Sequence, residues 1–150
     1  MNNAKIQEAL QELIIKLQDA EKMYTEIYNA TSNIIIKNWM KKYTDERHEF
    51  HRELELQSYK LGGHPVVKTS IMGELHRFMI DVKLNNIDGS IPTIINEIEK
   101  GSNVLLDDYK SILNLDMSKE LRVVLNSQMR KINQEKEALV TLREELLSPV

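Results

Sequence analysis

Residues 29–33 of the chain read Asn-Ala-Thr-Ser-Asn, and this polar stretch separates two long segments of helical periodicity. Before it, apolar residues recur at spacings of threes, fours and sevens: Ile6, Leu10, Leu13, Leu17, Tyr24 and Tyr28. After it, a similar series follows: Ile36, Trp39, Tyr43, Phe50, Leu54 and Leu61. Because Asn, Thr and Ser end helices and cap the next ones, the two segments are predicted to form an antiparallel hairpin of long helices.

The second helix is predicted to stop at Gly62-Gly63-His64-Pro65. Gly accepts the left-handed conformation that follows a helix, and Pro prevents its continuation. Further apolar series with helical spacing follow this break. We predict helices over residues 4–29, 33–61, 70–85, 90–114 and 118–147, and no strand, because no segment alternates with period two.

Two long hairpins, joined by a connection that contains its own short helix, predict an all-α four-helix bundle with a crossover along its full height. The length of 150 residues fits one domain, residues 1–150. The composition agrees, because 5 Gly and 3 Pro are few for a β-sandwich or barrel. A coiled-coil dimer is the alternative, but the turns that interrupt the series favour an intramolecular bundle.

The composition also excludes several classes of function. The chain has no Cys, which removes thiolate nucleophiles, Cys-ligated zinc and iron–sulfur clusters. Its net charge is −3, so it lacks the basic balance of a nucleic-acid-binding protein. The longest apolar runs, such as residues 34–36, are far too short to span a membrane. No signal peptide is visible, so we expect a cytoplasmic protein. We further expect that it binds neither nucleic acid nor membrane. It is expected to self-associate through the exposed parts of the apolar stripes that these series form on their helices.

Three glutamates interrupt the apolar stripes: Glu21, Glu46 and Glu135. Their apolar neighbours in the stripes are Leu17 and Tyr24, Tyr43 and Phe50, and Ile132 and Leu139. At about 100° per residue, each glutamate is predicted to point towards the bundle axis near the middle of its helix. Ser102, which follows Gly101, offers a hydroxyl at the corresponding place in the predicted helix over residues 90–114. A buried carboxylate must be protonated, paired or bound to a metal.

One interpretation is therefore a core metal site. Carboxylates suit iron or manganese, and di-iron bundles place Glu on two helices and Glu-x-x-His on two others. The predicted ligands are Glu21, Glu46 and Glu135, with Glu49 or His51 assisting, although no His stands three residues after Glu46 or Glu135. The alternative is that each glutamate lies at the edge of its stripe or bonds a polar neighbour, namely Tyr24, Tyr43, Tyr109 or Gln128.

Histidines offer a second candidate. His48 and His51 share one helical face with Glu55, a spacing that can form a surface zinc site. His48 is predicted to lie almost opposite the apolar stripe of its helix, and His51 is predicted to lie on the flank of that stripe. Solvated side chains on a charged helix are the alternative interpretation.

Several segments carry a resemblance over nearly the whole chain, from about residue 6 to 145: Leu10–Ile14, Asp19–Tyr24, Asp45–Arg47, Leu61–Gly63, Gly73–Arg77 and Ile98–Ser102. In their order and spacing the chain resembles a bacterial ferritin-like family of unknown function. The resemblance implies a ferritin-like bundle and no established activity. It also implies acidic positions at Glu21 and Glu46, whereas Ser102 and Glu135-Lys136 stand where an acidic residue and a His are expected.

We therefore expect a non-catalytic binding, interaction or stress-related module with a degenerate metal site. The alternative is a metal-binding ferritin-like protein, in which bundle-core carboxylates hold iron or manganese and support oxidoreductase activity. A third, weaker hypothesis places an apolar ligand between the hairpins beside Trp39 and Met40.

Overall fold

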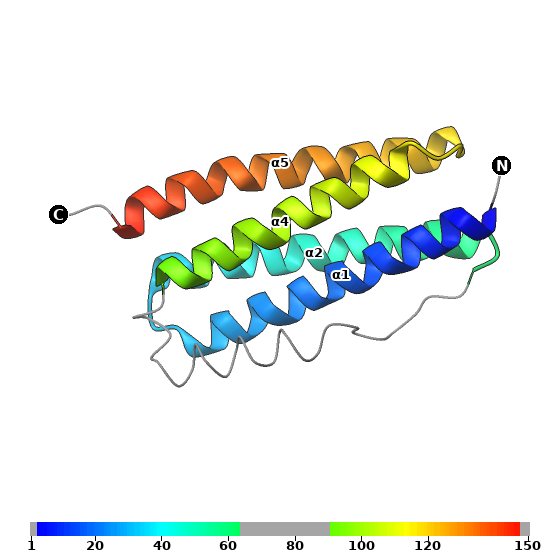
Figure 1. Cartoon of the computed structure of the whole chain (residues 1–150). Coiled ribbons are helices and arrows are strands. Elements are labelled where there is room, and N and C mark those ends of the chain that lie inside the picture. Colours follow the sequence, from blue (N-terminus) through cyan, green and yellow to red (C-terminus); the bar gives the residue numbers. More distant parts are fainter. Residues whose placement is uncertain (1–2, 64–90, 148–150) are drawn as a thin grey trace.

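The computed structural model describes residues 3–63 and 91–147. These residues form four helices: α1 (Asn3–Ala30), α2 (Ile34–Lys60), α4 (Ile91–Leu113) and α5 (Lys119–Leu147). No strand occurs within the described ranges. The predicted all-α four-helix bundle is confirmed, as Figure 1 shows. The predicted short helix over residues 70–85 lies outside the described residues.

The helix boundaries agree with the predicted ranges to within one residue at each end. Asn33 caps α2, because its side-chain oxygen accepts hydrogen bonds from the backbone N–H groups of Ile35 and Ile36 at 2.9 and 3.2 Å. At the other end of α2, Gly62 adopts the left-handed conformation with φ +87°, as the Gly-Gly break predicts. The local signals for turn and cap therefore set the length of the first hairpin.

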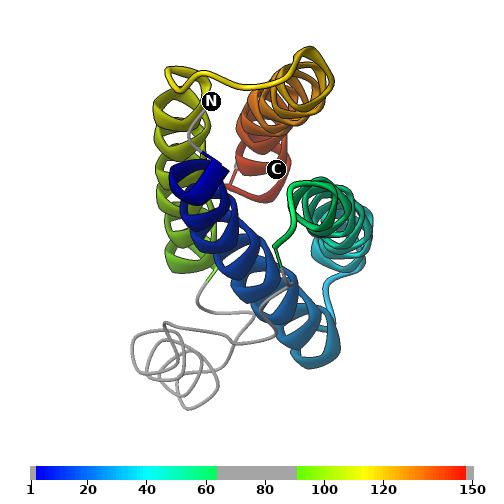
Figure 2. The same cartoon turned by 90° about the vertical axis from the view of Figure 1, so that its right-hand side faces the viewer.

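The two hairpins pack side by side. Helices α1 and α2 run antiparallel, as do α4 and α5 (Figure 1). Viewed along the bundle, the four helices form a ring in which α1 contacts α2 and α4, and α5 contacts α4 and α2 (Figure 2). Each helix thus has two neighbours, which requires an apolar stripe wide enough to face both of them.

The core consists of two apolar halves. One half includes Leu17, Phe50, Leu105 and Ile132. The other includes Tyr24, Tyr43, Ile98 and Leu139. Each fully buried aliphatic or aromatic side chain contributes about 1.5–3 kcal/mol, so these halves supply most of the stability.

A polar layer lies between the two halves at mid-height and consists of Arg47, Ser102 and Glu135. Each member stands between the two core residues of its own helix named above, and all three are at most 1% exposed. The sequence predicted polar groups at this height for two of these positions, Ser102 and Glu135. Arg47 is the member that it did not predict.

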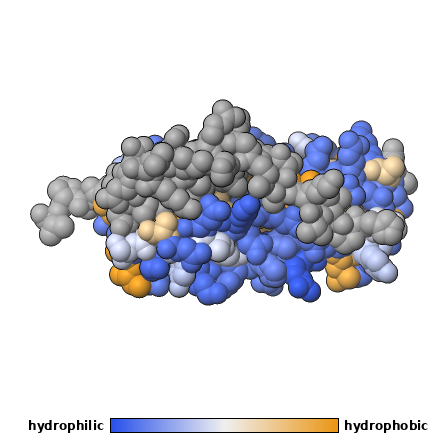
Figure 3. Space-filling view, turned by 90° about the horizontal axis from the view of Figure 1, so that it is seen from below, coloured by the Kyte–Doolittle hydropathy of each residue, from blue (hydrophilic) through white to orange (hydrophobic). Residues whose placement is uncertain are grey.

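The face of the described residues that is seen from below is mostly hydrophilic. From below, Figure 3 shows charged and polar residues along the middle of the described surface and separate apolar residues towards the two ends. None of the described helices is long and apolar enough to cross a membrane.

Candidate metal site

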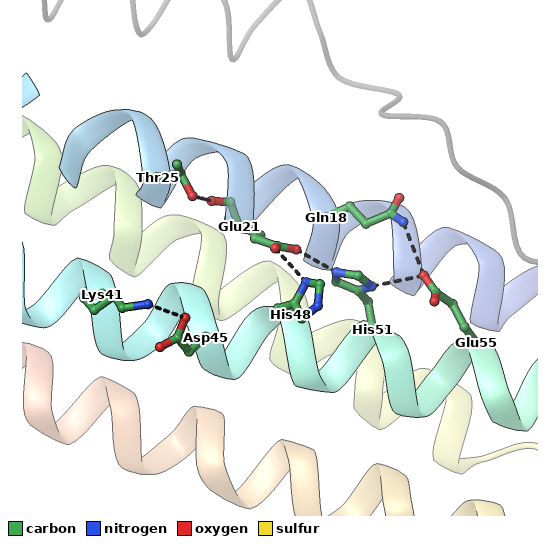
Figure 4. A network of polar contacts seen from close by, with 8 residues as sticks. All are labelled: Gln18, Glu21, Thr25, Lys41, Asp45, His48, His51 and Glu55. Atoms are coloured by element: carbon green, nitrogen blue, oxygen red, sulfur yellow. Dashed lines mark hydrogen bonds and ion pairs between the residues drawn. The ribbon is translucent and has the colours of Figure 1, made fainter. Parts of the chain in front are cut away.

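Three side chains with metal-ligating atoms meet where α1 lies beside α2 (Figure 4). One carboxylate oxygen of Glu21, Oε1, lies 2.8 Å from Nδ1 of His48, and the other, Oε2, lies 2.6 Å from Nε2 of His51. The ligand atoms of the three residues all lie within 4.8 Å of one another. We call Glu21, His48 and His51 the Glu–His cluster.

Helix geometry brings the cluster together. His48 and His51 are three residues apart on α2, which places their side chains next to each other on one face. Their rings meet edge to face, with centroids 4.9 Å apart. Glu21 reaches them from the antiparallel helix α1. The cluster therefore links two helices of one hairpin, and its formation depends on their register.

The three side chains of the Glu–His cluster differ in their exposure to solvent. The side chain of His51 is 8% exposed, that of Glu21 is 26% exposed and that of His48 is 52% exposed. His51, the inner ligand, is thus held in the protein, whereas His48, the outer ligand, is open to solvent. A metal ion could enter from the His48 side without any opening of the bundle.

The donor set of two imidazoles and one carboxylate suits zinc and neighbouring divalent transition metals better than magnesium or calcium, which prefer oxygen ligands. Ligands about 2.0–2.2 Å from a tetrahedral zinc lie roughly 3.3 Å apart. The contacts of 2.6 and 2.8 Å are hydrogen bonds, so Glu21 and each histidine must move apart by less than 1 Å or so to admit an ion.

A second carboxylate contacts His51 on the side of its ring that faces away from Glu21. Oε1 of Glu55 lies 3.0 Å from Nδ1 of His51, the ring nitrogen that faces away from Glu21. Nε2 of Gln18, on α1, donates a hydrogen bond of 3.4 Å to the same oxygen of Glu55. Figure 4 shows this chain of contacts and, nearer the start of α2, the separate ion pair of Lys41 with Asp45.

The structure places Glu21 differently from the sequence-based prediction, which directed it to the bundle axis. The inward positions of α1 follow an alternating spacing of four and three: Ile6, Leu10, Leu13, Leu17, Ala20, Tyr24 and Ile27. Ala20, and not Glu21, continues this series. Glu21 lies about 100° further round the helix, on the side of α1 that faces α2, and pairs there with the two histidines.

A similar shift applies to Glu46. The inward series of α2 consists of buried residues: Ile36, Met40, Tyr43, Arg47, Phe50 and Leu54. Arg47 therefore points to the axis, and Glu46, one residue earlier, is half-buried. Burial raises the pKa of Glu46. Glu49 is exposed on α2.

Glu135 is the predicted ligand that does reach the axis. Its carboxylate lies 2.6 Å from Nη2 of Arg47, and both side chains are fully buried. The hydroxyl of Tyr24 donates a hydrogen bond of 3.3 Å to the same carboxylate. This bond was the alternative to metal binding that the sequence left open, and the structure confirms it for this pair.

The four glutamates predicted as metal ligands therefore do not converge. Glu135 already has a guanidinium as its counter-ion, Glu49 is exposed, and Glu21 faces the histidines. Because Arg47 holds the place beside Glu135, the residues present do not fit a core iron or manganese centre. Ligation by Glu46, Glu49 and Glu135 stays a prediction that this geometry does not favour.

The histidine-based hypothesis comes closer to the observed arrangement. His48 and His51 do lie together, and Glu55 contacts His51 as their shared face implies. The missing member was Glu21, which no spacing on α2 could reveal. His51 is buried rather than solvated, because the flank of the α2 stripe is covered by α1.

The fold and these contacts define a class: an all-α four-helix bundle with a candidate transition-metal site between α1 and α2. The chain belongs to the family described as Domain of unknown function (DUF2383), which matches residues 5–115. This span includes the whole Glu–His cluster and Glu55 and ends before α5 and Glu135. No curated protein matches the chain.

Proposed function

We propose that this chain is a metal-binding helical bundle that holds one divalent transition-metal ion, with zinc as the reference ion, through Glu21, His48 and His51. The observation that carries the proposal is the convergence of their ligand atoms within 4.8 Å from two different helices. Two imidazoles and a carboxylate are a common donor set for zinc.

The proposed function is metal binding on the flank of the bundle and not metal catalysis in its core. At the centre of the bundle, where a di-iron protein gathers carboxylates and histidines, this chain has the Arg47–Glu135 ion pair. A resident cation there supplies the positive charge that a metal would otherwise bring. The core position is thus a degenerate metal site, and the metal-binding capacity lies on the flank of the first hairpin.

We further propose that the bundle is related to ferritin-like proteins. Two antiparallel hairpins and a polar layer at mid-height support this relationship, because ferritin-like bundles place their metal ligands on inward positions of all four helices. In this proposal Arg47 and Ser102 stand where ligands were lost, and the Glu–His cluster is a separate site.

The test is isothermal titration calorimetry of the untagged full-length chain with Zn²⁺ in a buffer that does not chelate it. The chain contains 4 His, so one double variant can probe the proposed pair and another can serve as its control. We expect one zinc ion per chain for the wild type and for the control His64→Gln/His76→Gln. The variant His48→Gln/His51→Gln should lose binding.

Retained binding in His48→Gln/His51→Gln would overturn the proposal, as would loss of binding in the control variant. Circular dichroism before titration establishes that each variant is folded. His48→Gln alone provides a second measurement, because this exposed side chain can be changed without disturbing the core.

A further inference from the structure

We propose that Glu55 is a positioning residue of this site, which fixes the tautomer and ring orientation of His51 so that Nε2 is the metal ligand. The inference rests on the proposed function of the Glu–His cluster. It adds a residue outside the cluster and predicts which nitrogen of each imidazole faces the ion.

The contacts of His51 carry the first step. Its ring lies between two carboxylates, with Nε2 2.6 Å from Glu21 and Nδ1 3.0 Å from Glu55. When one ring nitrogen binds a metal, the other carries a hydrogen that needs an acceptor. Glu55 supplies that acceptor, and it therefore favours the form in which Nδ1 is protonated and Nε2 is free to bind the ion.

Helix geometry carries the second step. Glu55 is four residues after His51 on α2, so the two side chains are neighbours on one helical face. Glu55 is also held from the other helix, because Gln18 on α1 donates a hydrogen bond to Oε1. The acceptor is thus fixed by two helices before any metal arrives.

Burial carries the third step. The side chains of His51 and Glu55 are 8% and 23% exposed, so water competes little for their hydrogen bond. A ring flip of His51 would remove both carboxylate contacts at once. The orientation of the inner ligand is therefore set by the protein.

His48 differs in the nitrogen that it presents. Its Nδ1 faces Glu21 at 2.8 Å, and its side chain is half-exposed. The structure therefore predicts an asymmetric site, in which the metal is bound by Nε2 of His51 and by Nδ1 of His48. The part of this pattern that depends on Glu55 is the single tautomer of His51, with Nδ1 protonated, and a purely structural role of Glu55 would not produce that spectroscopic signature.

The experiment is long-range ¹H–¹⁵N NMR of the zinc-loaded full-length chain, combined with zinc affinities from competition with a chelating dye. In the wild type we expect protonated Nδ1 and zinc-bound Nε2 for His51. Glu55→Ala should weaken zinc binding about 10–100-fold and lose this single tautomer, which is the usual cost of removing an outer partner of a ligating His. Glu55→Gln should recover part of the affinity, because its carbonyl oxygen still accepts from Nδ1.

Glu49→Ala is the matched control, since it removes the same charge from an exposed position of the same helix. It should leave affinity and tautomer unchanged. If the wild type binds zinc and Glu55→Ala binds equally tightly with the same tautomer, the positioning role is wrong and the proposed function stands. If the wild type binds no zinc, both are overturned.

Discussion

Arg47 and Glu135 form an ion pair of 2.6 Å, and both side chains are completely excluded from solvent. Arg47 belongs to α2 in the first hairpin, and Glu135 belongs to α5 in the second. The guanidinium also lies near two aromatic rings, 5.7 Å from the centroid of Tyr24 and 5.9 Å from that of Phe50. The pair thus joins the two hairpins across the centre of the bundle.

Breaking this pair from one side should destabilise the protein strongly. In Arg47→Met the methionine fills much of the space, but the carboxylate of Glu135 stays buried without its cation. We expect a loss of about 3–5 kcal/mol in the free energy of unfolding, measured by urea denaturation at neutral pH. A loss below about 1 kcal/mol, typical of a surface pair, would contradict the burial of this pair.

Replacing both partners should cost far less. Arg47→Met/Glu135→Leu leaves no buried charge, and such exchanges are often neutral or stabilising by about 1–4 kcal/mol. Comparison of the two single variants with the double variant gives the coupling energy of the pair directly. If the double variant loses as much as the sum of the single ones, the two residues do not act together.

The effect of Arg47→Met should depend on pH. Burial raises the pKa of Glu135 above its ordinary value of 4.5, and Arg47 acts against this rise. Without Arg47 the pKa rises further, so the folded variant binds the proton more tightly than the unfolded chain does. Its stability therefore falls as pH increases from about 4.5 through the raised pKa.

Urea denaturation at neutral pH and near pH 5 or so checks this sign. The difference between the wild type and Arg47→Met should be smaller at the lower pH. An equal difference at both pH values would show that the loss comes from packing and not from the buried charge.

The fold could be predicted from the sequence because its signals are local. The polar stretch at 29–33 and the Gly-Gly break mark the ends of helices, and apolar residues recur between them with helical spacing over many turns. Such signals depend on a few neighbouring residues. The four described helices and their hairpin pairing follow from them.

The candidate site could be predicted only in part, because it depends on how two helices face each other. A single residue of shift changes the direction of a side chain by about 100°, which separates Glu21 from Ala20 and Glu46 from Arg47. The spacing of four and three residues identifies Arg47 as an inward position, but a fully buried Arg is rare unless it is paired. Its partner, Glu135, lies 88 residues away in the sequence.

Metal binding should stabilise the hairpin. An ion held by α1 and α2 binds the folded state and not the unfolded one, so zinc at 100 times its Kd should add about 2.7 kcal/mol. Thermal or urea unfolding with and without zinc measures this gain. The variant His48→Gln/His51→Gln should show no gain, and an equal gain in that variant would place the ion elsewhere.

The end of α2 offers a prediction that is independent of the metal. Gly62 has φ +87°, and a Cβ at this position would meet only Nε2 of Gln7, at 4.0 Å. The cost of Gly62→Ala is therefore a backbone cost, about 1–2 kcal/mol. Gly62→Asn should cost less, because Asn tolerates this conformation better. Equal unfolding midpoints for the wild type and Gly62→Ala would contradict the left-handed cap.

The most direct test of the central claim is a crystal structure of the zinc-loaded chain with anomalous diffraction data at the zinc edge. We predict one strong anomalous peak between α1 and α2, in contact with Glu21, His51 and His48. A peak beside Glu135 in the core, a peak at other residues only, or no peak at saturating zinc would contradict the proposed site.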